Sequence, residues 1–144
     1  MKRFPVIGVL CVSAALGLAA CSDNSNDNSA AEQATKAAAD LCTDLNALKA
    51  DNAKLKALNP TSATKDQVKD AYDAVQKDWG NVKNNLAKMK QAEQDAVKDA
   101  SENLKKGYEA LPGDTTGKDA LTKLQPQILK LDEASTAAST GLKC

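Results

Sequence analysis

Residues 68–89, VKDAYDAVQKDWGNVKNNLAKM, decide the fold class of this chain. Apolar side chains recur in this stretch at alternating spacings of four and three residues, with mostly Lys, Asp and Asn between them. These apolar residues are Val68, Tyr72, Val75, Trp79, Val82, Leu86 and Met89. Because an α-helix has 3.6 residues per turn, this spacing places all of them on one stripe of a helix. A narrow apolar stripe of this kind is typical of helices that pack against other helices.

The stripe continues towards the C-terminus, but its register slips at Glu93. The residues that continue it are Val97, Ala100, Leu104, Tyr108 and Leu111. Gly80 is the one helix-weak residue before Gly107, and a helix tolerates a single glycine at a cost of about 1 kcal/mol. We therefore expect one long helix from Thr64 to Leu111, in which Glu93 marks the place for a kink. Folding back of the segment near Glu93 is the alternative.

Two further helices flank this segment. The stripe of the first is formed by Ala34, Ala38, Leu41, Leu45, Leu48, Asn52 and Leu55, and that of the last by Leu121, Leu124, Ile128, Leu131, Ser135, Ala138 and Leu142. Pro60 ends the first helix, and Pro126 predicts a kink or a break in the last. Thr64 with Gln67 predicts a capping box, and Thr116 predicts a second N-cap.

These helices predict an all-α fold over residues 31–144. We expect an elongated antiparallel three-helix bundle or coiled coil with a long central helix, and a compact four-helix bundle is the alternative. The single Asn52 on an apolar stripe is typical of a residue that fixes helix register. Trp79 and Tyr72 lie on the central stripe, so packing in the core is the expected role of both.

The first twenty residues have a different pattern. Lys2 and Arg3 precede an uncharged apolar run over residues 4–18, which is shorter than the roughly 20 residues of a membrane-spanning helix. Leu18-Ala19-Ala20-Cys21 follows this run and resembles the lipobox of bacterial lipoproteins at all four positions. The resemblance implies that residues 1–20 are a signal peptide cleaved after Ala20, and that Cys21 carries a diacylglyceryl group.

A lipidated Cys21 implies an exported protein, anchored to the outer face of the cell membrane or to the outer membrane. Residues 21–30 contain no apolar side chain larger than alanine apart from Cys21, so we expect a flexible tether there. Cys11 lies in the signal peptide, which leaves Cys42 and Cys144 as an even pair in an oxidising setting. These two cysteines are predicted to form a disulfide.

The composition argues against several classes of function. The chain has no His, and its one Arg lies in the signal peptide, so the usual general base and the usual bidentate anion clamp are missing. Loss of Lys2 and Arg3 leaves 17 basic residues against 19 acidic ones, which disfavours nucleic acid as a partner. Carboxylate pairs such as Asp66/Asp70 and Asp95/Asp99 have lysines between them and are expected to face solvent. We predict no enzyme activity, no cofactor and no metal site.

The sequence therefore predicts a membrane-anchored, non-enzymatic envelope lipoprotein that acts as a helical binding or structural module. The partners that fit are an envelope protein or peptidoglycan. Murein-anchored spacer lipoproteins are similar in combining a lipobox with heptads, but this chain ends in Lys143 and Cys144, which makes Lys143 a poor site of covalent attachment. A binder of small ligands or peptides, with a cleft where Glu93 and Pro126 disturb the seams, and an inhibitor or immunity protein are the alternatives.

Overall fold

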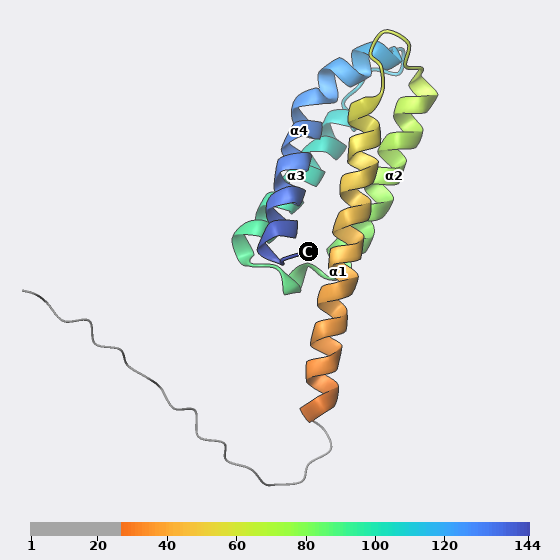
Figure 1. Ribbon diagram of the computed structural model, residues 1–144. Helices are drawn as coiled ribbons and strands as arrows, with labels where there is room; N and C mark the ends of the chain where they lie inside the picture. The colour runs from red at the N-terminus through yellow and green to blue at the C-terminus, as the bar shows by residue number, and fades with distance from the viewer. Residues whose placement is uncertain (1–26) are drawn as a thin grey trace, which may run out of the picture.

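The computed structural model describes residues 27–144, which form an all-helical structure with four α-helices (Figure 1). The elements are α1 (Asp27–Ala57), α2 (Lys65–Asn84), the short 3₁₀-helix η1 (Leu86–Lys88), α3 (Gln91–Glu109) and α4 (Gly117–Gly141). Within these described residues, none of the helices has the length and apolarity that crossing a bilayer requires.

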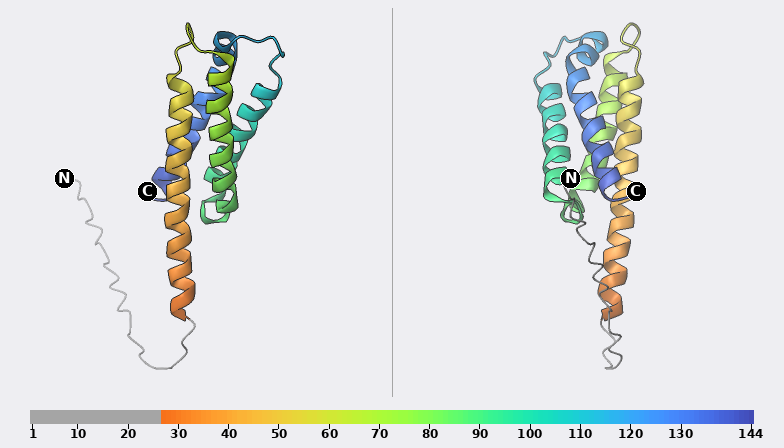
Figure 2. Two further views of the ribbon diagram at one scale, coloured as in Figure 1. Left: turned by 90° about the vertical axis from the view of Figure 1, so that its right-hand side faces the viewer. Right: turned by 60° about the vertical axis from the view of Figure 1, so that its left-hand side comes forward.

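The four helices run alternately in opposite directions (Figure 1). Helix α1 packs against α2 and α4, and α3 packs mainly against α4, whereas α2 and α3 touch each other only sparsely. The loops 58–64 and 110–116 lie together at one end, which we call the distal end (Figures 1 and 2). At the opposite end, α1 continues well beyond the other helices and beyond the C-terminus (Figure 2).

The single helix expected over residues 64–111 is two helices, because the chain turns at 85–90. Asn84 and Asn85 have low helix propensity, since their amides compete for backbone hydrogen bonds. Met89 is buried beyond them and fixes the turn against the core. The turn lies before Glu93, the residue at which the apolar stripe of the sequence slips. The chain has already reversed its direction when α3 begins at Gln91.

Both predicted N-caps are confirmed. Thr64 accepts a hydrogen bond from the Gln67 backbone N–H, and the Gln67 side chain accepts one from the Thr64 backbone, which completes a capping box. The Thr116 hydroxyl accepts from the Asp119 backbone N–H at 3.2 Å. Helix α4 continues through Pro126, so the last predicted helix is one element.

The predicted stripes meet in one core, except at the start of the first stripe, where Ala34 is exposed and Ala38 is half-buried. Its fully buried members come from all four α-helices and include Leu45, Leu48, Val75, Leu104 and Leu131, each with no exposed area. The core is aliphatic for most of its length and is interrupted by small polar side chains such as Ser101 and Ser135. Burial of these apolar side chains is the main contribution to the stability of the fold.

Residues 32–40 of α1 form a stalk below the bundle. Most of their side chains are exposed, and only Ala37 and Ala38 are half-buried. The predicted tether over residues 21–30 agrees only in part with this arrangement, because residues 27–30 belong to α1. The other tether residues, 21–26, lie outside the described part of the chain.

Two glycines provide a matched test of the packing at the distal end. Gly117 is buried at the start of α4, and a Cβ atom there would overlap the backbone of Ala63 and Thr64, whereas a Cβ at Gly80 would meet nothing. We expect Gly117→Ala to lower the free energy of unfolding by about 1–3 kcal/mol through overpacking. Gly80→Ala should raise it by about 0.5–1 kcal/mol, because Gly80 is exposed inside a helix. Urea denaturation followed by circular dichroism measures both changes, and a stabilising Gly117→Ala would contradict the described loop packing.

Candidate functional site

The predicted disulfide is present and joins the middle of α1 to the C-terminus. Cys42 and Cys144 are bonded, with 5.4 Å between their Cα atoms and a sequence separation of 102 residues. Cys42 is half-buried and Cys144 is exposed. The C-terminus is thereby fixed beside α1 (Figure 1). The predicted lipidation site, Cys21, lies outside the described residues.

Asn52 lies in the core, where its stripe position predicted it. It has no exposed area, and its side-chain Nδ2 donates to the main-chain oxygen of Ile128 at 3.0 Å. This hydrogen bond ties α1 to α4 at one level. The side-chain Oδ1 of Asn52 is buried without a hydrogen-bond partner in the described chain, and the role of this residue in fixing helix register stays a prediction.

The two predicted core aromatics are both buried. Trp79 is 8% exposed and Tyr72 is 6% exposed. Tyr72 stacks on Tyr108, with 3.8 Å between ring centroids, and so joins α2 to α3 near the distal end. Burial raises the pKa of Tyr72 to about 12, and the nearby carboxylate of Glu109 contributes to this shift. The phenol therefore stays neutral at physiological pH.

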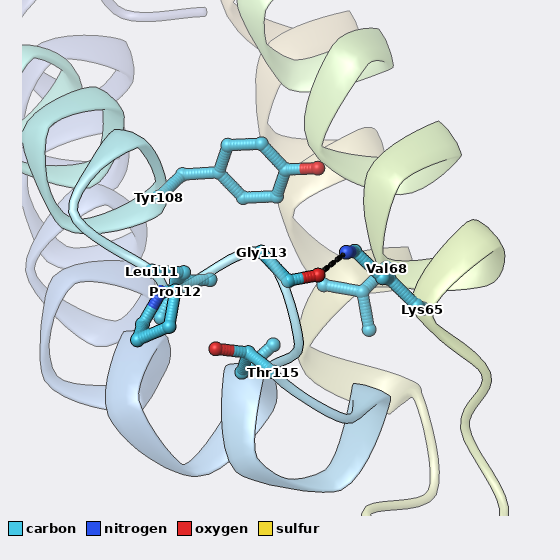
Figure 3. A pocket seen from close by; sticks show the side chains of 8 residues that line it. Lys65, Val68, Tyr108, Leu111, Pro112, Gly113 and Thr115 are labelled. Carbon is cyan, nitrogen blue, oxygen red and sulfur yellow. Dashed lines mark hydrogen bonds between the residues drawn. The ribbon is translucent and has the colours of Figure 1, made fainter.

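A small hollow, the distal hollow, opens beside this aromatic stack (Figure 3). It has a volume of about 120 Å³ and is walled by Val68, Tyr108, Leu111, Pro112 and Ala120. The Lys65 ammonium crosses its mouth and donates to the Gly113 carbonyl. This contact links the start of α2 to the loop between α3 and α4 at the distal end.

A second hollow, the side hollow, lies between the end of α1 and helix α4. It is lined by Leu55, Lys56, Leu58, Pro60, Leu121, Gln125, Ile128 and Leu129, with a volume of about 270 Å³. Leu129 is 39% exposed and is the large apolar side chain that the described surface leaves open. Lys56 and Asp132 form an ion pair of 3.0 Å, so the apolar opening has a charged residue in its wall.

A pair of carboxylates in the α1–α2 seam was not anticipated from the sequence. Asp78 is buried, and burial together with the Asp51 carboxylate raises the pKa of Asp78 above its ordinary value. Lys54 donates to Asp51 at 2.6 Å. Asp78 precedes Trp79 on the flank of the stripe, where the sequence pattern gave no reason to expect burial.

The Asp78 carboxyl makes stability depend on pH. Because its pKa is higher in the folded state than in the unfolded state, the folded protein favours the protonated form, and stability falls as pH rises through the folded pKa. We expect Asp78→Asn to raise the melting temperature at pH 7 and to reduce the loss of stability as the pH rises above about 4, the ordinary pKa of an Asp carboxyl. The exposed Asp99→Asn is the control and should change neither. If both variants shift the profile equally, Asp78 is not the group responsible.

The paired carboxylates considered from the sequence are distributed over the helix surfaces. Asp66 and Asp70 are exposed on α2, and Asp95 and Asp99 are exposed on α3. Lys69 forms an ion pair with Asp73 on the same helix. Over the described residues, no three His, Cys, Asp or Glu side chains gather in a way that could hold a metal ion.

Comparison of the chain with known protein families, with curated proteins and with solved structures finds no match.

Proposed function

We propose that this protein is a lipid-anchored bacterial envelope lipoprotein whose helical domain is a non-enzymatic binding module. The similarity of Leu18-Ala19-Ala20-Cys21 to a lipobox supports the anchor. The Cys42–Cys144 disulfide is consistent with export, because disulfides persist in oxidising compartments. The stalk begins close in sequence to Cys21, so an anchor there would leave the distal end farthest from the membrane.

We also propose that the domain is a compact four-helix bundle. The turn at 85–90 returns the chain, so that α3 packs along α4 (Figure 1). Leu104 of α3 is fully buried, and this supports α3 as a full member of the bundle. A compact bundle on a stalk is better suited to presenting a binding end than to spanning a long distance.

The single observation that carries the binding role is the side hollow with its exposed Leu129. A contiguous exposed apolar surface is typical of a protein interaction site. Leu58 and Pro60 add apolar surface beside Leu129, and both belong to the distal end. The partner we propose is an envelope protein, which would dock on the side hollow.

Site-specific photocrosslinking in living cells tests this role. A photoreactive amino acid replaces Leu129 in one variant and Lys130 in a matched control, because Lys130 is exposed on the same helix but does not line the side hollow. We expect a discrete crosslinked species from position 129 that is absent from position 130. Identical products from both positions would contradict docking at the side hollow.

A further inference from the structure

The distal hollow has the size of one aliphatic side chain. Its walls are apolar, and Thr115 completes the lining. The volume of about 120 Å³ is somewhat smaller than that of a cavity of about 150 Å³ that binds a benzene molecule. An aliphatic group of about four carbons therefore fits into the hollow, whereas an indole does not.

Hydrogen-bond donors with unused capacity surround the hollow. The Lys65 ammonium has three N–H donors, and the Gly113 carbonyl uses one of them. The hydroxyls of Tyr108 and Thr115 make no hydrogen bond among the described residues. Figure 3 shows the Tyr108 hydroxyl on the side of the hollow where the Lys65 ammonium lies. Burial raises the pKa of Tyr108, so its phenol keeps its proton and remains a donor.

The lining of the hollow carries a positive charge. Lys65 is the charged side chain in this lining, and it has no ion-pair partner in the described chain, where the ion pairs involve other lysines. The carboxylates that act on Tyr108 are those of Asp73 and Asp70. Neither of them lines the hollow, and Asp73 is paired with Lys69. A ligand group that is negatively charged and only accepts hydrogen bonds suits this environment, and a carboxylate has both properties.

We propose that the distal hollow binds the C-terminus of a peptide whose last residue is aliphatic. The aliphatic side chain enters the hollow, and the terminal carboxylate accepts hydrogen bonds from the Lys65 ammonium and the Tyr108 hydroxyl. Capture of a C-terminal carboxylate is a recurring mode of peptide recognition. The inference does not depend on the docking of a protein at the side hollow.

A peptide suits the distal hollow better than a free aliphatic acid does. A free acid that fills the hollow ends with its carboxylate at the mouth and has no further atoms to contribute. A peptide continues past the carboxyl-terminal residue over Pro112 and Gly113, which are exposed and line the hollow. These extra contacts should make the peptide the tighter ligand.

Fluorescence anisotropy of a labelled peptide tests the proposal. A short fluorescein-labelled peptide that ends in leucine with a free carboxylate is titrated with the full chain in detergent, and we expect saturable binding. The same peptide with a C-terminal amide should bind about tenfold more weakly or worse, because it lacks the charge that Lys65 binds. A peptide that ends in tryptophan should also bind more weakly, because an indole exceeds the volume of the hollow.

Two lysine variants locate the binding. Lys65→Gln should weaken binding of the acid peptide about tenfold and remove the difference between the acid and the amide. Lys118→Gln is the matched control, because Lys118 is exposed at the same end of the bundle but does not line the hollow. It should leave both affinities unchanged. Circular dichroism melts establish that both variants are folded.

Three results would overturn the proposal. The first is no saturable binding of the acid peptide up to millimolar concentration. The second is equal binding of the acid and the amide by the wild type, since the carboxylate would then have no role. The third is displacement of the labelled peptide by free 4-methylpentanoate at the same concentration as by the unlabelled peptide, because the peptide chain would then contribute nothing.

Discussion

We expect the Cys42→Ser/Cys144→Ser variant to lose about 4–5 kcal/mol of unfolding free energy relative to the wild type. The disulfide joins residues separated by 102 positions, and closure of so long a loop removes much of the entropy of the unfolded chain. A loss of this size is a large part of the stability of a small domain. Urea denaturation of the two proteins, followed by circular dichroism, measures the difference.

Wild-type protein in a reductant is the control for this experiment. The exposed Cys144 makes the bond accessible, so the reduced wild type should unfold at the same urea concentration as the double variant. Equal midpoints for the oxidised and the reduced wild type would show that the disulfide does not contribute to stability in the described way.

The second large effect is expected from Leu104→Ala. Leu104 is fully buried in the core, and its truncation should reduce the free energy of unfolding by about 2–5 kcal/mol, because a cavity forms and apolar contacts are lost. Leu129→Ala is the matched control, since Leu129 is 39% exposed. Its effect on stability should stay within about 0.5 kcal/mol.

This pair of variants also tests the position of α3. If α3 packs along α4 as described, Leu104→Ala lowers the urea midpoint strongly and Leu129→Ala does not. A midpoint for Leu104→Ala that equals the wild type would mean that α3 is not part of the cooperative core.

Much of the fold could be predicted from the sequence because the apolar spacing is regular. The stripes through Leu45 and Leu124 gave the correct element type and the correct buried faces. The caps at Thr64 and Thr116 followed from local hydrogen-bonding chemistry, which does not depend on the rest of the fold. The pairing of Cys42 with Cys144 could be predicted because Cys11 was expected to be removed with the signal peptide and Cys21 to be lipidated, which leaves these two thiols.

The reversal between α2 and α3 could not be predicted from spacing alone. A stripe with four-three spacing is the same whether the chain continues straight or returns, so residues on both sides of the turn fit a single long helix. The slip at Glu93 indicated a disturbance but not its form. Asn84 and Asn85 provided the local signal, and burial of Met89 after them fixed the turn.

The candidate sites were harder to predict from the sequence than the helices, because they depend on contacts between helices. Stacking of Tyr72 on Tyr108 requires the antiparallel approach of α2 and α3, which the expected long helix did not include. Burial of Asp78 opposite Asp51 depends on the level at which α1 and α2 pair.

The central proposal, the lipid anchor, is tested most directly by expressing the full sequence in bacteria and measuring the mass of the protein isolated from their membranes. We expect the isolated protein to begin at Cys21 and the Cys21 thiol to carry a diacylglyceryl group. Cys21→Ser should abolish this modification and release the protein from the membrane fraction. A wild-type protein whose N-terminus is Met1, or whose Cys21 carries no lipid, would contradict the proposed lipid anchor.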